Sequence, residues 1–209
     1  MLLDNKGFDL WANNYDLDVN LSNETNTYPF AGYKDILATI YSEIMSKKPC
    51  RVLDIGIGTG ILAAKLYEGG NDITGLDFSE EMLKIAFGKM PNAKLVQHNF
   101  TGGLPAEIAG EKFDFIVLTY AIHHLRYEEQ REFILSALDY LSEDGRIIIG
   151  DIAFENTDMH EKCRKENEDG WDLDEFYIVY SDLVENLGTN CKSKYKQISH
   201  CGGIVHIWN

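Results

Sequence analysis

The sequence has few basic residues for its length. Its 209 residues include 19 Lys and Arg against 34 Asp and Glu, which gives a formal net charge of -15 at pH 7. A nucleic-acid-binding protein normally carries a basic patch that neutralises phosphates. In the densest basic stretch, residues 192–196, lysines alternate with other residues, as on the solvent side of a late strand. These features argue against a nucleic-acid partner and favour a small molecule.

The sequence also lacks long apolar runs and paired cysteines. No run approaches the ~18 apolar residues of a membrane span, and the first residues lack the basic-then-apolar order of a signal peptide. We therefore expect a cytoplasmic protein without a membrane partner. Its cysteines show no paired spacing, and Cys50 opens a buried strand, so free thiols are expected. We expect no metal site, because the residues that resemble zinc ligands match no common spacing; they are His160, Cys163, His200 and Cys201.

Length and composition are those of one globular domain. Hydrophobic residues make up 44% of the chain and charged residues 25%, which are ordinary values. A chain of 209 residues is long enough to bury one α/β core. We expect residues 1–209 to form a single domain, as a monomer or a homodimer.

The spacing of apolar residues predicts alternating helices and strands. The predicted helices cover about 34–47, 60–68, a segment capped by Ser79, and 128–141. The predicted strands cover 51–55, 72–77, 94–98, 113–118 and 145–150, followed by a mixed helical region over 158–187 that is broken near Gly170. Two final strands, over 191–199 and 203–208, are joined by a turn at 201–203 and predict an antiparallel hairpin. The order of these elements predicts an α/β fold with a mostly parallel sheet.

Glycines follow the first predicted strand, and an acid ends the second. The glycines are Gly56, Gly58 and Gly60, and the acid is Asp77. In an open α/β sheet a ligand binds at the carboxyl ends of the strands, where glycine lets it approach the backbone. An acid at the end of the following strand accepts hydrogen bonds from a ribose diol. The two segments therefore predict a site for a ligand with an adenosine-like part.

The spacing of these glycines separates two classes of ligand. A dinucleotide-binding loop has the pattern Gly-x-Gly-x-x-Gly, and its helix N-terminus faces a pyrophosphate. Here the pattern is Gly-x-Gly-x-Gly, and Asp54 precedes it. A carboxylate in this position suits a cationic ligand and repels a pyrophosphate. The loop therefore disfavours an NAD-dependent oxidoreductase.

The stretch Val-Leu-Asp-Ile-Gly-Ile-Gly-Thr-Gly over 52–60 resembles motif I of the class I S-adenosylmethionine-dependent methyltransferases. Residues 112–117 and 141–148 resemble the family's fourth-strand motif and its approach to the fifth strand. The resemblance covers about residues 45–152. It implies a Rossmann-like, doubly wound fold, with a mostly parallel seven-stranded sheet that ends in an antiparallel hairpin and has helices on both faces.

The resemblance also implies a cofactor, S-adenosyl-L-methionine, and a product, S-adenosyl-L-homocysteine. In the family the glycine loop lies under the methionine part and the ribose, and the later acid holds both ribose hydroxyls. Many members bind the adenine amino group with an Asp after the third strand. Asn99 stands there in this chain; its amide oxygen can still accept from that amine, in a neutral and weaker contact. The candidate cofactor-binding residues are Tyr15, Asp54, Gly56, Gly58, Gly60, Asp77, Phe78, Met82, Asn99, Phe100 and Thr119, with plain core packing as the alternative for Phe100.

Three segments outside motif I carry a closer resemblance. Residues 8–16 are similar to the Trp-Ala-x-x-Tyr-Asp opening of small bacterial methyltransferases. Together with residues 120–125 and 151–156, they resemble a group of uncharacterised Firmicutes-type methyltransferases. In related enzymes the first aromatic segment folds over the cofactor as a lid.

This resemblance implies a division of the methyltransferase domain into lid and core. The lid is expected over 1–48, and the core over 49–209 with a lid insertion around 155–180. Within the insertion, the acidic and aromatic residues 171–177 are either a second lid or an exposed helix start. The aromatic residues of the first segment either line the site or only attach a helix to the sheet; they are Trp11, Tyr15, Tyr28 and Tyr33.

Two adjacent histidines are the candidate catalytic residues. His123 and His124 follow the fourth predicted strand, at the sheet edge where the methyl group is expected to point. An imidazole titrates near neutrality and can take a proton or bind an acceptor; the alternative is that the pair only caps a helix or bonds the backbone. Asp151 and Glu155 follow the fifth strand, and each is either an acceptor-binding group or a loop acid.

Methyl transfer from a sulfonium is an in-line displacement, in which the protein aligns the reactants and excludes water. The sequence therefore predicts a methyltransferase that acts on an unidentified small-molecule acceptor. Residues 119–122 contain no proline, which argues by resemblance against the amino-group methyltransferases of nucleic acids and glutamine. The alternatives are a protein that binds S-adenosylmethionine or S-adenosylhomocysteine without transferase activity, a protein methyltransferase and, less favoured, an NAD-dependent oxidoreductase.

Overall fold

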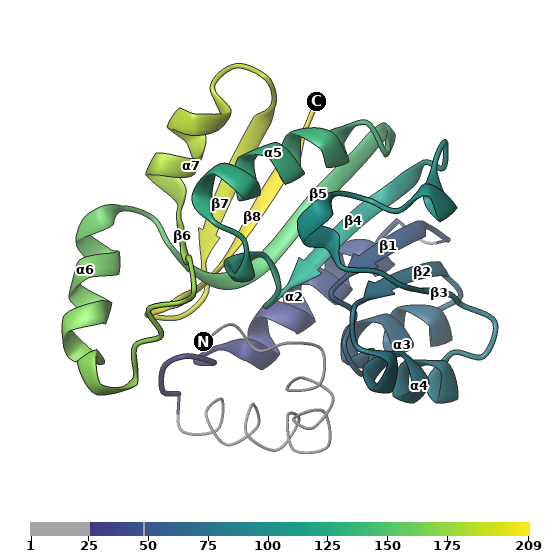
Figure 1. The fold of residues 1–209 in the computed structure, drawn as a ribbon, viewed down its shortest axis with the longest axis horizontal. Coiled ribbons are helices and arrows are strands. Elements are labelled where there is room, and N and C mark those ends of the chain that lie inside the picture. Colours follow the sequence, from purple (N-terminus) through teal and green to yellow (C-terminus); the bar gives the residue numbers. More distant parts are fainter. Residues whose placement is uncertain (1–25, 48) are drawn as a thin grey trace.

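The computed structural model describes residues 26–47 and 49–209 (Figure 1). The predictions for Trp11 and Tyr15 lie outside these residues. Within them, no helix is both long enough and apolar enough to cross a membrane.

Helices and strands alternate along most of the chain. The strands are Arg51–Ile55 (β1), Asp72–Asp77 (β2), Lys94–Gln97 (β3), Phe113–Thr119 (β4), Leu141–Phe154 (β5), Ile178–Val179 (β6), Lys192–Gln197 (β7) and Gly202–Trp208 (β8). The helices are Tyr33–Met45 (α2), Ile61–Glu68 (α3), Glu80–Lys89 (α4), Tyr127–Leu138 (α5), Thr157–Glu166 (α6) and Tyr180–Leu187 (α7). Ser79 caps α4 as predicted, since its side chain accepts a hydrogen bond from the Met82 N–H.

The strands form one mixed sheet in the order β3-β2-β1-β4-β5-β8-β7, with the short β6 beside β5 (Figure 1). The pairs from β3 to β5 are parallel, and β8 is antiparallel to both β5 and β7. This arrangement confirms the predicted Rossmann-like fold with a terminal antiparallel hairpin. Because β1, β4 and β5 run side by side in one direction, their carboxyl ends meet at one edge of the sheet.

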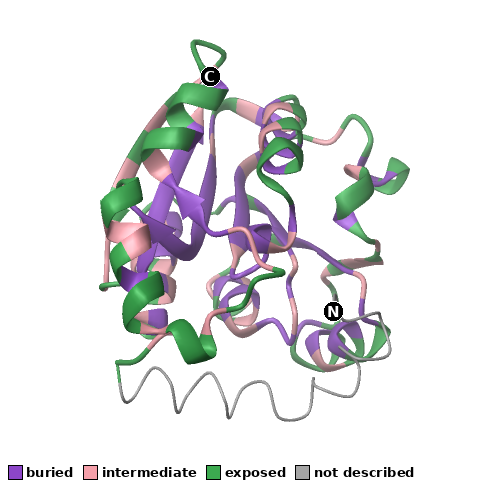
Figure 2. Ribbon diagram, turned by 60° about the vertical axis from the view of Figure 1, so that its left-hand side comes forward, coloured by how far each residue is buried: buried purple, intermediate pink, exposed green. Residues whose placement is uncertain are grey.

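Both faces of the sheet are covered, because successive strand residues point to opposite sides. Val52 packs in the cluster that contains α2 and α3, whereas its neighbour Leu53 packs with α5 and α7. Ile148 and Ile149 of β5 divide between the two clusters in the same way. Figure 1 shows α5 and α7 on one side of the sheet and α2, α3 and α4 on the other. In Figure 2 the buried strands lie between helices whose outer surfaces are exposed.

The last strands differ from the prediction in their boundaries. Gly202 and Gly203 do not form the hairpin turn; they pair within β8 against Ile152 and Asp151 of β5. A Cβ atom on Gly203 would lie 2.4 Å from the Tyr195 hydroxyl oxygen, so the glycine allows β7 and the neighbouring strands to pack closely. The lysines of β7 alternate with half-buried residues and face solvent, as predicted.

Strand β5 is also longer than predicted. It starts at Leu141, which pairs with Phe113, and an irregularity in the register separates this pair from the one between Phe115 and Arg146. Residues that read as a turn in the sequence, Ser142 to Asp144, are therefore part of a bulged strand. The far end of β5 extends to Phe154 and carries Asp151 into the buried interior.

Candidate active site

The glycine loop after β1 is fixed to the end of β2 by hydrogen bonds. The backbone N–H groups of Gly56 and Ile57 both donate to the Leu76 carbonyl, at 2.8 and 3.0 Å. Gly56 has φ +71°, and a Cβ atom there would lie 2.7 Å from the Ala121 Cβ. Gly58 also has positive φ, but the space around it is open. The loop therefore brings bare backbone to the cavity surface, which is what close approach of a ligand requires.

Asp77 supports this loop from the end of β2. One carboxylate oxygen accepts from the Gly58 N–H at 2.8 Å, and the other accepts from the Ser79 N–H at 2.9 Å. A carboxylate oxygen can accept more than one hydrogen bond. The buried Asp77 thus fixes the loop and the start of α4, and it lines the same cavity as Gly58.

Asp54, the last-but-one residue of β1, carries a buried carboxyl group. Its side chain is 2% exposed, and its Oδ1 atom has no hydrogen-bond partner within residues 26–47 and 49–209. Burial raises the pKa of Asp54 to about 7, and the nearby carboxylate of Asp77 contributes in the same direction. An ionised carboxylate in this position is stabilised when a cation binds beside it.

One cavity of about 850 Å³ joins the carboxyl ends of β1, β2 and β4. This volume lies in the range of small-molecule and cofactor sites, ~300–1,000 Å³. The predicted cofactor-binding residues that line it are Asp54, Gly56, Gly58, Asp77, Phe78, Met82, Asn99, Phe100 and Thr119. Gly60 is not among the lining residues; it starts α3 with φ +75°, and a Cβ atom there would lie 2.9 Å from the Met90 Cε. The structure therefore gives Gly60 a role in helix packing.

Two of the candidate cofactor-binding residues, Asn99 and Phe100, also have structural roles. The Asn99 side-chain oxygen accepts from the Thr101 N–H at 3.1 Å and caps a short 3-10 helix. Phe100 is buried against Phe133 of α5, with ring centroids 5.4 Å apart, which agrees with the core-packing alternative. Both residues nevertheless line the cavity.

His123 and Asp151 form a buried pair at the ends of β4 and β5. The Nδ1 atom of His123 lies 2.6 Å from Asp151 Oδ1, which also accepts from the Ile152 N–H at 2.7 Å. Burial alone would lower the pKa of His123, but the charge and hydrogen bond of Asp151 outweigh burial and, with Glu175, raise the pKa to about 8. The other Asp151 oxygen, Oδ2, has no hydrogen-bond partner in the described part of the chain.

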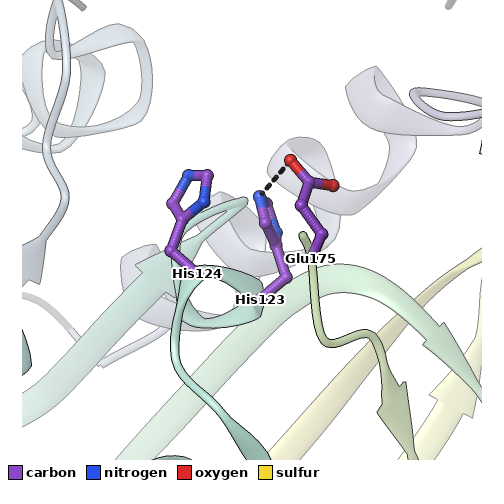
Figure 3. A group of neighbouring side chains, drawn as sticks. All are labelled: His123, His124 and Glu175. Atoms are coloured by element: carbon purple, nitrogen blue, oxygen red, sulfur yellow. Dashed lines mark ion pairs between the residues drawn. The ribbon is translucent and has the colours of Figure 1, made fainter. Parts of the chain in front are cut away.

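His124 and Glu175 complete a group of three side chains around His123 (Figure 3). The His123 and His124 rings lie 4.3 Å apart, and His123 Nε2 lies 3.5 Å from Glu175 Oε1. Burial and the neighbouring His123 lower the pKa of His124 to about 3, so this imidazole is neutral at pH 7. All three residues line the cavity.

Aromatic residues from two distant segments pack beside this group. The Tyr177 hydroxyl donates to Glu175 Oε2 at 2.7 Å and is also hydrogen-bonded to the Tyr28 hydroxyl. Tyr28 stacks on Trp171, with ring centroids 5.2 Å apart. Tyr33 lines the cavity directly.

The segment around 171–177 is the part of the site that sequence reasoning located least well. Asp172, Asp174, Glu175 and Phe176 line the cavity. Its acidic and aromatic composition was the available signal, but composition does not reveal which side chains turn inward. The two acids that were predicted to follow the fifth strand differ in their surroundings. Asp151 is fully buried beside His123, whereas Glu155 is exposed.

Comparison with known proteins agrees with this geometry. A family model described as "Methyltransferase domain" matches residues 52–145. An "uncharacterized methyltransferase" of Alkaliphilus oremlandii is 34% identical over 179 residues, which cover 86% of this chain and 79% of that protein. Another from Staphylococcus carnosus is 33% identical over 187 residues, which cover 86% of this chain and 84% of that protein.

Solved structures show the same fold at lower identity. The magnesium protoporphyrin IX methyltransferase of Synechocystis, solved with bound S-adenosylhomocysteine, has a TM-score of 0.68 at 16% identity, and the match covers 98% of this chain and 99% of that one. The family match extends over β1, β2 and β4, whose carboxyl ends build the cavity, and the relatives match most of the chain. The chain belongs to the methyltransferases.

Proposed function

We propose that this protein transfers a methyl group from S-adenosyl-L-methionine to a small-molecule acceptor. One observation carries the proposal: a single cavity is lined both by the glycine loop with Asp77 and by His123 with His124. The first group suits a nucleoside-bearing cofactor, and the second offers polar atoms to an acceptor. A shared cavity is what transfer between two bound molecules requires.

The residues present fit the cofactor. Gly56 and Gly58 present backbone without side chains, and the Asp77 carboxylate lies at the end of β2, where a ribose diol is bound in open α/β sheets. Asp54 adds a buried carboxyl oxygen without a hydrogen-bond partner among the described residues. Burying such an oxygen against an apolar ligand costs free energy, whereas a cationic ligand beside it stabilises the carboxylate. S-adenosylmethionine carries a sulfonium and an ammonium group, and either matches this carboxylate.

When bound, S-adenosylmethionine supplies an electrophilic methyl group on sulfur. The chain itself has to hold the acceptor, orient it and keep water out. Asp151 fixes the His123 ring, so Nε2 is directed toward Glu175 and the cavity. His123 and His124 are the groups that we place against the acceptor, and Phe176 and Tyr120 supply apolar walls beside them.

The charge and size of the cavity favour a small acceptor. Among the residues that the structure describes, its lining holds six carboxylic acids, which are Asp54, Asp77, Glu129, Asp172, Asp174 and Glu175, against one arginine, Arg126. With a net charge of -15 for the whole chain, an extended phosphate-rich substrate is disfavoured. We propose that residues 155–180 act as a lid on the acceptor side, in a cytoplasmic enzyme that works as a monomer or homodimer.

Calorimetric titration with S-adenosylmethionine, S-adenosylhomocysteine and NAD tests the cofactor part of the proposal. The test variant is Asp77→Asn, which keeps the size of the side chain that holds Gly58 and Ser79. The matched control is Asp72→Asn, at the exposed start of the same strand. We expect both sulfur ligands to bind the native protein and the control, and affinity to fall at least ~10-fold in Asp77→Asn, about the cost of one charge-assisted hydrogen bond.

A methyl-transfer assay with a panel of hydroxylated, amine and thiol acceptors then tests whether the protein transfers the methyl group to a small molecule. Formation of S-adenosylhomocysteine that depends on an added small molecule supports the proposal. Binding without turnover on any acceptor favours a regulatory binding protein, and turnover only on added protein favours a protein methyltransferase. Binding of NAD in place of the sulfur ligands would refute the proposal.

A further inference from the structure

We propose that His123, His124 and Glu175 bind a divalent transition-metal ion of the zinc type at the acceptor end of the cavity. This revises the expectation from the sequence that the chain has no metal site. The metal site stands on its own geometry, whereas its role in holding the acceptor rests on the proposed methyltransferase function.

The three side chains already lie close to the geometry of a coordination site. Each offers one ligand atom, and these atoms lie within 4.8 Å of one another. In a tetrahedral zinc site, bonds of ~2.0–2.2 Å place ligand atoms ~3.4 Å apart. His123 Nε2 and Glu175 Oε1 are 3.5 Å apart, so this pair needs almost no movement. His124 has to close the remaining gap, and its ring is only partly buried.

The supporting hydrogen bonds are those that metal ligands usually have. A ligating histidine normally gives its second ring N–H to a carboxylate, which fixes the ring and directs the other nitrogen to the metal. Asp151 does this for His123 at 2.6 Å, and the Ile152 N–H holds Asp151 in turn. Figure 3 shows His123 between His124 and Glu175.

The carboxylate ligand is supported in the same manner. Glu175 presents Oε1 to His123, while its Oε2 accepts from the Tyr177 hydroxyl at 2.7 Å. Because Tyr177 uses its only proton there, Tyr28 donates to the Tyr177 oxygen. A chain of hydrogen bonds thus orients Glu175 with one oxygen toward the cluster, although Glu175 lies in an otherwise irregular segment.

The chemistry of the ligands indicates the class of metal. Two imidazoles and one carboxylate suit zinc and its neighbours among the transition metals, whereas magnesium and calcium prefer all-oxygen sites. Three protein ligands leave one coordination position open, as in catalytic zinc sites. Since all three ligands line the cavity, we place an oxygen or other donor atom of the acceptor at that position.

Zinc and cobalt titrations of chelator-treated protein test the proposal. We expect one Zn²⁺ per chain by calorimetry, and a visible absorption band with Co²⁺ of the kind that tetrahedral coordination gives. His124→Ala and Glu175→Gln are expected to weaken Zn²⁺ binding at least ~10-fold, and Asp151→Asn to weaken it ~10–100-fold through the His123 ring. The matched control is His200→Ala, because His200 is exposed and lies outside the cluster.

Each outcome decides the question. Stoichiometric Zn²⁺ binding that is lost in both His124→Ala and Glu175→Gln, and kept in His200→Ala, supports the site. Absence of stoichiometric binding, or binding that persists in either His124→Ala or Glu175→Gln, overturns it and leaves His123 as an imidazole held between two carboxylates. Circular dichroism verifies that each variant is folded. S-adenosylmethionine titration of the same samples reports the cofactor site separately, so failure of the metal site is distinguishable from failure of the methyltransferase proposal.

Discussion

Replacing Asp54 by asparagine is expected to change how stability depends on pH. The pKa of this buried carboxyl is about 7 in the folded protein, against an ordinary value of 3.8. Between these two values the folded state binds more protons than the unfolded state. Stability therefore falls as pH rises through this window, and the loss is complete above pH 7.

The size of the effect follows from the two pKa values. At about 1.4 kcal/mol for each pH unit between them, ionised Asp54 lowers the free energy of unfolding by about 4 kcal/mol at pH 8. At pH 5 the folded protein keeps the proton, and the loss is roughly 1.7 kcal/mol. Between pH 5 and pH 8 the native protein thus loses roughly 2.5 kcal/mol that Asp54→Asn does not lose.

Thermal unfolding of the ligand-free protein measures this difference. For a chain of this size, about 1 kcal/mol corresponds to roughly 2–4 °C in Tm. We compare the Tm of Asp54→Asn minus the Tm of the native protein at the two pH values. This difference is expected to be roughly 5–10 °C larger at pH 8 than at pH 5. Any constant cost of burying the asparagine amide is present at both pH values and cancels.

Asp72→Asn is the control, because Asp72 is exposed at the start of β2 and pairs only weakly with Arg51, at 3.7 Å. Its Tm difference from the native protein is expected to stay constant over the same range. If the Tm difference for Asp54→Asn is equally constant from pH 5 to pH 8, the reasoning about burial of this carboxyl is wrong.

Four further substitutions test the scaffold of the site, each by thermal or denaturant unfolding. Gly56→Ala is expected to cost more stability than Gly58→Ala. In both variants an alanine has to adopt positive φ, which costs about 1–2 kcal/mol, but only at position 56 would the new Cβ also lie 2.7 Å from the Ala121 Cβ. Equal losses of stability would contradict the close contact with Ala121. Ser79→Ala removes the cap of α4 and is expected to cost about 1 kcal/mol. Ile148→Ala leaves a cavity in the centre of β5 and is expected to cost about 2–5 kcal/mol; a loss below about 1 kcal/mol would contradict its full burial.

Much of the fold followed from the sequence, because its main signals are local. A short apolar run followed by glycines specifies the β1 strand and its loop, and Ser79 specifies the start of α4. The glycines at 202 and 203 misled the prediction of the hairpin, since glycine is typical of turns. In the structure Gly203 is a strand residue that makes room for Tyr195 of the paired strand β7, and local residue patterns do not specify such a contact between strands.

The candidate site was predicted only in part, for the same reason. His123 and Asp151 were each placed at the carboxyl edge of the sheet, because each follows a predicted strand. That they form a pair at 2.6 Å depends on β4 and β5 being neighbours, which local patterns do not determine. Glu175 and Tyr177 come from a segment without a regular period, and only the folded chain shows that they turn toward His123.

The raised pKa of Asp54 has a consequence for binding as well as for stability. If a cation of the cofactor binds beside the ionised carboxylate, the protein has to release the Asp54 proton at any pH below about 7. Affinity for that ligand is then expected to rise up to about tenfold for each pH unit between pH 5 and pH 7. S-adenosylhomocysteine keeps the ammonium group of S-adenosylmethionine but lacks its sulfonium.

Comparing the two ligands therefore identifies the group that Asp54 recognises. An equal pH dependence for both ligands assigns Asp54 to the ammonium group, and a dependence for S-adenosylmethionine alone assigns it to the sulfonium. Asp54→Asn is expected to remove the part of the change in affinity between pH 5 and pH 7 that is due to this carboxyl, whichever cation binds beside it. Calorimetry in buffers of different ionisation enthalpy counts the released protons directly. If no proton is released with either ligand at pH 6, the cation lies elsewhere, and the buried carboxyl remains protonated in the complex.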